Sequence, residues 1–243
     1  MEKKSSSLHD YSTELSSIEI GADLRVKPSA IANALQEAAR KHADSLGWGV
    51  ETIQQKKLYW VLARTRVEIA KRPGYASKIT IHTWPKGTAG RYALRDFEGS
   101  ANQRDFLKAT SSWVLVDALT GRPVSVDQLY ELFNERANEH AIETPAEKIT
   151  IPEKFDGELV VEPLYSDLDV LGHVNNARYL DWAWSAVPED IRMRTKGWTV
   201  NYLKEVKAGQ TMTVKARTTP SEATVVGFNK NQKPAFLVSF HIE

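Results

Sequence analysis

Residues 29–46 read SAIANALQEAARKHADSL and are followed by Gly47. Alanine favours helices, and apolar side chains recur here at intervals of three and four residues, so the stretch predicts a helix that ends at the glycine. Strand-like segments follow at residues 59–69, 78–84, 90–98 and 106–117. A helix followed by such a series of strands is typical of an α+β layer fold, with the helix lying on an antiparallel sheet.

The same order of elements appears again in the second half of the chain. An aromatic-rich helix is expected at residues 175–187, followed by strands at 199–206, 211–217, 223–230 and 234–243. Aligning residues 22–31 with residues 166–175, an offset of 144, matches Asp23 with Asp167, Leu24 with Leu168 and Val26 with Val170. Repetition of this kind indicates an internal duplication, so we expect two units, each a long helix on a curved antiparallel sheet.

The segments outside these units set the expected boundaries. Residues 1–8 are polar and predict a disordered tail, and residues 9–126 form the first unit. Residues 127–158 predict a linker that contains a short acidic helix, expected at 126–137, and residues 159–243 form the second unit.

Composition excludes several classes of protein. The chain has 243 residues, a formal net charge of +1 and no cysteine. A thiol nucleophile and a cysteine-ligated metal site are therefore excluded, and the balanced charge argues against a nucleic-acid partner. No apolar run approaches the length of a membrane helix, and the first residues lack the apolar region of a secretory signal, so we expect a cytoplasmic protein without a membrane partner.

The stretch richest in chemistry is SDLDVLGHVNNARYLDW, residues 166–182. Asp169 and His173 lie four residues apart across Gly172, immediately before a predicted helix. A carboxylate beside an imidazole suits the activation of water, and the glycine permits a close backbone approach to a ligand. The first amides of the helix have no intrahelical partner and can stabilise an oxyanion. This combination predicts an acyl-transfer site.

Each of these residues also has a structural interpretation. Asp169 can be a turn residue, and Asn175 and Asn176 are good N-cap residues as well as possible substrate contacts. Gly-x-Ser-x-Gly, Walker and dinucleotide motifs are absent, and no histidine pair has metal-site spacing, so we expect neither a metal nor an organic cofactor. The other histidines are interpreted as surface or core residues: His9, His42, His82, His140 and His241.

The segment DLDVLGHVNNARYLDW, residues 167–182, resembles the signature of hotdog-fold thioesterases, and the chain from about residue 11 to residue 243 resembles the acyl-acyl-carrier-protein (acyl-ACP) thioesterases. The stretches that support the resemblance are LYWVLARTRVEI (58–69), ITIHTWP (79–85), SSWVLVD (111–117) and NYLKEV (201–206). It implies two tandem hotdog repeats and hydrolysis of a fatty acyl thioester on the phosphopantetheine arm of acyl carrier protein. The second repeat would be catalytic, and the first would shape the acyl pocket.

The resemblance also implies roles for individual residues. Asp169 and His173 match the catalytic Asp and His, and Glu205 matches a catalytic carboxylate on a following strand. The thioester carbonyl is expected on the amides of His173 and Val174, with the other substrate contacts from residues of the same turn: Gly172, Asn175 and Asn176. The expected acyl pocket lies between the first helix and its sheet and is lined by four apolar residues: Leu35, Trp60, Leu62 and Trp84.

One position departs from the family pattern. The family commonly reads Asp-x-Asn-x-His, and the middle Asn is Leu171 here. A leucine cannot donate a hydrogen bond to a carbonyl. Either the helix amides suffice, which we favour, or Asn175 substitutes, or activity is low. An acyl-CoA thioesterase and a non-catalytic acyl-binding protein therefore stay as alternatives, and a homodimer is an open possibility.

Overall fold

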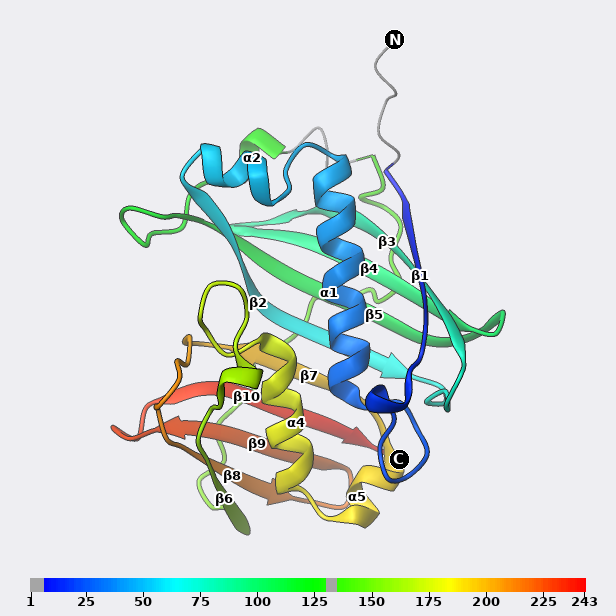
Figure 1. Cartoon of the computed structure of the whole chain (residues 1–243), viewed down its shortest axis with the longest axis vertical. Coiled ribbons are helices and arrows are strands. Elements are labelled where there is room, and N and C mark those ends of the chain that lie inside the picture. The colour runs from blue at the N-terminus through cyan, green and yellow to red at the C-terminus, as the bar shows by residue number, and fades with distance from the viewer. Residues whose placement is uncertain (1–6, 130–134) are drawn as a thin grey trace.

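The structure, a computed structural model, describes residues 7–129 and 135–243. Its strands form one antiparallel sheet in the order β1-β3-β4-β5-β2-β7-β10-β9-β8-β6 (Figure 1). The strands are β1 (His9–Glu14), β2 (Leu58–Ile69), β3 (Lys78–Ala89), β4 (Tyr92–Ala101), β5 (Arg104–Asp117), β6 (Gly157–Val161), β7 (Thr195–Tyr202), β8 (Met212–Thr218), β9 (Glu222–Asn229) and β10 (Pro234–Ile242). The predicted α+β class with a large antiparallel sheet is confirmed.

Two main helices, α1 (Pro28–Ser45) and α4 (Asn176–Ala186), lie side by side on one face of this sheet (Figure 1). Two short helices accompany them, α2 (Val50–Gln55) and α5 (Glu189–Arg194). Pro28 occupies the first turn of α1, where its missing N–H costs nothing. The two helices touch through a hydrogen bond of 3.4 Å from the Asn176 side-chain amide to Gln36 Oε1.

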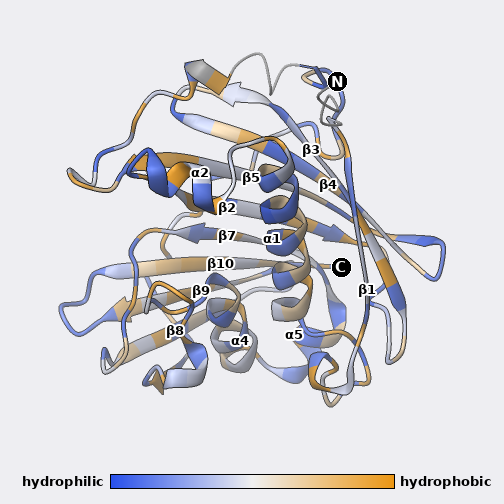
Figure 2. Ribbon diagram, turned by 45° about the horizontal axis from the view of Figure 1, so that its top comes forward, coloured by the Kyte–Doolittle hydropathy of each residue, from blue (hydrophilic) through white to orange (hydrophobic). Residues whose placement is uncertain are grey.

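The two halves of the sheet join where β2 pairs with β7, from Arg64 opposite Asn201 to Glu68 opposite Gly197. A Cβ atom at position 197 would lie only 2.2 Å from the carbonyl oxygen of Val67, so this junction requires glycine. Side chains from both halves form one hydrophobic core between the sheet and the helices. In Figure 2 the face of α1 turned away from the sheet is mostly hydrophilic, as an amphipathic helix requires.

The segment between the halves is held by buried polar groups. Asp96 is fully buried, and its Oδ2 atom accepts hydrogen bonds from Lys86 Nζ at 3.0 Å and from the amide of Ala141 at 2.8 Å. Lys86 Nζ also donates to the carbonyl of Ile142 at 2.7 Å. Neighbouring strand residues point to opposite faces, and Arg95 contacts His42 on α1, so Asp96 and residues 141–142 lie on the face away from the helices.

The structure differs from the expected elements in several places. It adds strand β6 and the short helices α2 and α5, which were not predicted. Strand β1 was not predicted, because an edge strand that buries no side chain fully carries no strong apolar pattern. Strand β7 begins at Thr195 and ends at Tyr202, whereas the prediction continued to Val206; the amides of Leu203 and Lys204 both turn to the carbonyl of Ala235. A helix was expected at 126–137, but residues 127–129 form a 3-10 turn and residues 130–134 lie outside the described residues. Residues 1–6 of the expected tail also lie outside the described residues.

Candidate functional site

Asp169 organises the turn that precedes α4. Its Oδ1 atom accepts hydrogen bonds from the amides of Leu171 at 2.9 Å and His173 at 3.1 Å. Its own amide donates to the carbonyl of His173 at 2.7 Å, and Gly172 adopts a φ of 75°, which suits glycine. The turn interpretation of Asp169 is therefore correct for one carboxylate oxygen. Within residues 7–129 and 135–243, Oδ2 has no hydrogen bond and stays available for chemistry.

The structure brings Glu205 to His173, although 31 residues separate them in the sequence. His173 Nε2 lies 3.3 Å from Glu205 Oε2, with side-chain exposures of 23% and 51%. Glu205 was predicted to lie on a strand, but it lies in the loop after β7. That loop is fixed beside the turn because the amide of Val174 donates to the carbonyl of Val206 at 2.8 Å. An imidazole held by a carboxylate in this way can move a proton.

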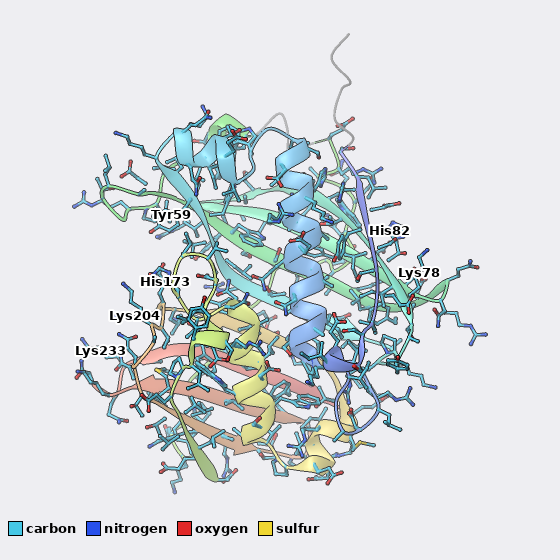
Figure 3. The ribbon with its side chains drawn as sticks, viewed as in Figure 1. Tyr59, Lys78, His82, His173, Lys204 and Lys233 are labelled. Carbon is cyan, nitrogen blue, oxygen red and sulfur yellow. The ribbon has the colours of Figure 1, made fainter. Side chains whose placement is uncertain are left out.

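Two tyrosines surround these groups, and the sequence did not single out either for the site. Burial and then the negative charge of Glu205 raise the pKa of Tyr59, which lies on β2 in the other half of the chain. Burial also raises the pKa of Tyr179 on α4, with smaller contributions from Glu205 and Asp169 that the amide of Val206 opposes. Figure 3 shows Tyr59 and His173 along the same edge of the molecule. Both phenols therefore keep their protons at neutral pH.

The expected oxyanion contacts need correction. The amide of His173 donates to Asp169, and the amide of Val174 donates to Val206, so neither is available to a thioester carbonyl in this structure. Asn175 is the N-cap of α4, since its Oδ1 accepts from the amide of Ala177 at 2.9 Å. The structure thus confirms the capping interpretation for Asn175. Among the described residues, the amide of Asn176, the first residue of α4, has no hydrogen bond.

An apolar cavity of about 250 Å³ opens next to this turn. Its walls come from α1, α2 and strands β2, β4 and β5, and include Leu46, Trp48, Ile53, Trp60 and Trp113. Val170 and Leu171 contribute from the turn itself and are largely exposed, which places the turn at the mouth of the cavity. Leu171 therefore takes part in the cavity wall, where the family pattern has an asparagine. An apolar cavity beside acid–base groups suits a hydrocarbon chain.

The four expected pocket residues have different positions. Trp60 lines the large cavity as predicted. Leu35 and Leu62 are buried around a separate void of about 10 Å³ between α1 and the sheet, about the space of one water molecule. Trp84 lines neither cavity, and its indole N–H donates to the carbonyl of Glu139 at 3.0 Å, so its assignment to the pocket was wrong. An alternating strand pattern identifies a buried residue but not the face of the sheet on which it lies.

The first half of the chain contains a second turn with the same backbone hydrogen bonds. The amide of Gly21 donates to Arg25 as that of Asp169 donates to His173, and the amide of Val26 donates to Pro73 as that of Val174 donates to Val206. Leu24, at the position of Gly172, has a φ of 58°. The two turns thus lie 148 residues apart, and the offset of 144 was wrong because it followed chance identities rather than backbone geometry.

This correspondence shows which half carries acid–base groups. Gly21 and Arg25 take the places of Asp169 and His173, and Arg72, the residue before Pro73, takes the place of Glu205. Arg72 forms an ion pair with Asp23 and packs over the Trp184 ring. The first turn therefore has no carboxylate at the position of Asp169 and no imidazole at the position of His173, and the combination suited to hydrolysis lies in the second half.

Two further observations concern metals and membranes. In residues 7–129 and 135–243, no three His, Asp or Glu side chains are grouped as a metal ion would require. No helix in the described part of the chain has the length and apolar character needed to cross a membrane.

Comparison with known proteins agrees with this geometry. Residues 7–133 match the family model of the acyl-ACP thioesterase N-terminal domain, and residues 153–234 match that of the C-terminal domain. The palmitoyl-acyl carrier protein thioesterase of Arabidopsis thaliana is 30% identical over 205 residues, covering 78% of this chain and 50% of the relative. The oleoyl-acyl carrier protein thioesterase 2 of the same plant is 28% identical over 218 residues, covering 78% and 57%. The chain spans about half the length of the curated relatives it matches.

Solved structures share the fold over nearly the whole chain. An acyl-ACP thioesterase from Bacteroides thetaiotaomicron superposes with a TM-score of 0.86 at 20% identity, covering 98% of both chains. The 12:0-ACP thioesterase of Umbellularia californica superposes with a TM-score of 0.84 at 21% identity, again over 98% of both chains. The two family models together span most of the sequence, on either side of the segment that joins the halves of the sheet. The chain therefore belongs to the acyl-ACP thioesterase family.

Proposed function

We propose that the protein hydrolyses the thioester between a fatty acyl chain and acyl carrier protein and releases a free fatty acid. The observation that carries this proposal is the position of Asp169, His173 and Glu205 beside the mouth of an apolar cavity of about 250 Å³. An acyl chain in the cavity would bring its carbonyl to the turn before α4. Membership of the family and the activities for which the relatives are named support the same reaction.

The chemistry follows from the groups at the turn. The Oδ2 atom of Asp169 takes a proton from water as the water oxygen adds to the carbonyl carbon, or it attacks the carbonyl carbon itself and water then hydrolyses the acyl-enzyme. The C–S bond breaks as the carbonyl re-forms, and His173 delivers a proton to the departing thiolate. Glu205 orients His173. We assign the oxyanion contact to the amide of Asn176, because a helix N-terminus favours developing negative charge.

We further propose that the chain is two tandem hotdog repeats, residues 9–126 and 159–243, joined by the linker at 127–158. The repeated turn and the helix of each half on a shared sheet support this division. The first repeat shapes the cavity and the second supplies the acid–base groups. Lysines beside the turn, Lys204 and Lys207, offer positive charge to an acidic carrier protein at the mouth.

The proposal is tested with a panel of acyl thioesters on two carriers, acyl carrier protein and coenzyme A. We expect faster hydrolysis on acyl carrier protein, and loss of most activity in His173→Ala. The control is His82→Ala, since His82 also faces a carboxylate, Asp10, at 2.7 Å, but on strand β3 rather than at the turn. Preference for coenzyme A would reassign the substrate. Tight acyl binding without hydrolysis by the wild type would favour the non-catalytic alternative.

A further inference from the structure

Arg95 is a buried arginine in the wall of the apolar cavity. It lies on β4, is only 7% exposed and lines the cavity together with Ala93 and Leu94. Its Nη1 atom contacts His42 Nδ1 at 3.0 Å and donates to Thr83 Oγ1 at 3.1 Å. Because a guanidinium can only donate, Nδ1 of His42 accepts, and both partners are neutral acceptors. The positive charge of Arg95 is therefore placed in an apolar wall without an anion beside it.

No carboxylate within the described residues forms an ion pair with Arg95. The adjacent Asp96 points to the opposite face of the sheet and pairs with Lys86 at 3.0 Å. Burial lowers the pKa of Arg95 to about 10, which still leaves it charged at neutral pH. Arg40, another arginine in the cavity wall, differs in this respect, because it pairs with Glu37 at 2.7 Å and Asp44 at 2.6 Å.

Arg95 and the turn that carries the reacting groups lie at different levels along α1. On α1, Gln36 contacts Asn176 and therefore lies beside the turn. His42, further along the same helix, contacts Arg95. These two helix residues are six positions apart, which corresponds to roughly 9 Å along the helix axis. An acyl chain entering from the turn would therefore run along apolar side chains before its far end approaches the guanidinium.

We propose that Arg95 sets the upper length of the methyl-terminated acyl chains that the cavity accepts. A guanidinium has five N–H donors. Arg95 uses two of these N–H groups in its hydrogen bonds to His42 and Thr83. A methyl group pressed against the others would remove water and provide no acceptor, which is costly for a charged donor. A chain of the same length that ends in a hydroxyl group provides an acceptor and is tolerated. This inference rests on the proposed hydrolysis of acyl thioesters.

The first test uses the wild-type protein with acyl-ACP substrates of increasing chain length. We expect kcat/KM to fall sharply beyond one length. At the first disfavoured length, a terminal hydroxyl should restore kcat/KM by about tenfold relative to the methyl-terminated chain, the ratio that one satisfied hydrogen bond of this kind provides. This comparison needs no substitution and therefore does not depend on how a variant folds.

The second test compares Arg95→Met with the control Arg217→Met, after thermal melting has shown that both are folded. Arg217 lies on β8, does not line the cavity and forms an ion pair with Asp156. We expect Arg95→Met to accept longer methyl-terminated chains and to lose the benefit of the terminal hydroxyl, while Arg217→Met keeps the wild-type length profile. If the wild type hydrolyses acyl-ACP but neither the hydroxyl nor Arg95→Met changes the profile, the inference about Arg95 is overturned. If no acyl thioester is hydrolysed at any length, the proposed function itself fails.

Discussion

Asp169 combines two roles that substitution can separate. One carboxylate oxygen, Oδ1, accepts the amides of Leu171 at 2.9 Å and His173 at 3.1 Å, and the other is the proposed catalytic group. Asp169→Asn keeps a carbonyl oxygen for the two amides and removes only the charge. Asp169→Ala removes both acceptor bonds. The two variants should therefore differ in stability while both lose activity.

The expected magnitudes follow from the geometry of the turn. The turn is partly exposed, so the two hydrogen bonds lost in Asp169→Ala are worth about 1–2 kcal/mol together. For a chain of this size that lowers Tm by roughly 2–8 °C. Asp169→Asn should keep Tm within about 1 °C of the wild type, by the same reasoning. Loss of the general base or nucleophile should lower kcat by roughly 10²–10⁴-fold in both variants.

The assay pairs calorimetric melting with steady-state hydrolysis of a long-chain acyl-ACP. Asp23→Asn is the matched control, because Asp23 Oδ1 accepts the amide of Arg25 in the corresponding turn of the first half. It should leave kcat unchanged. Retention of more than about a tenth of wild-type kcat in Asp169→Asn would refute the catalytic role and leave Asp169 as a turn residue alone.

Four further outcomes are expected. Glu205→Gln removes the carboxylate charge 3.3 Å from His173 and should lower kcat severalfold, because His173 loses the partner that orients it; an unchanged kcat would place Glu205 outside the mechanism. Tyr59→Phe should lower kcat/KM severalfold without lowering Tm, and equal kinetics would make Tyr59 a wall residue only. Asp96→Asn leaves the Lys86 charge buried without its partner and should cost about 3–5 kcal/mol, with Lys86→Met/Asp96→Asn less destabilised than Asp96→Asn in melting experiments. Treatment with EDTA should leave hydrolysis unchanged, and a loss that added metal restores would contradict the expectation of a cofactor-free enzyme.

Much of the local structure was predictable because it is encoded by neighbouring residues. The Ala-rich stretch at 29–46 predicts α1 to within one residue at each end, and Asn175 is the N-cap that its side chain favours. The Asp169–Gly172–His173 spacing predicts a tight turn before a helix, and the hydrogen bonds of Asp169 confirm that turn. In each of these cases the stabilising partner lies within a few positions along the chain.

Other features depend on contacts that sequence spacing does not encode. Trp84 and Trp60 both lie on predicted strands, yet only Trp60 reaches the cavity, because strand order and twist decide which face meets α1 and α2. The amide of His173 donates to the Asp169 carboxylate, and the amide of Val174 donates to the carbonyl of Val206 in the loop after β7. The bond to Val206 joins residues 32 positions apart, which sequence spacing does not reveal. The unpaired charge of Arg95 is visible only once its neighbour Asp96 is placed on the other face.

By itself, the sequence determined the two main helices, most strands, the turn before α4 and the presence of a carboxylate and an imidazole within it. The tertiary structure alone decided that Glu205 reaches His173, that Tyr59 from the first half lies at the site of the second, and that the turn opens onto a cavity. The physical reason is range. Periodicity and capping act between residues a few positions apart, whereas the pairing of β2 with β7 brings together groups more than a hundred residues apart.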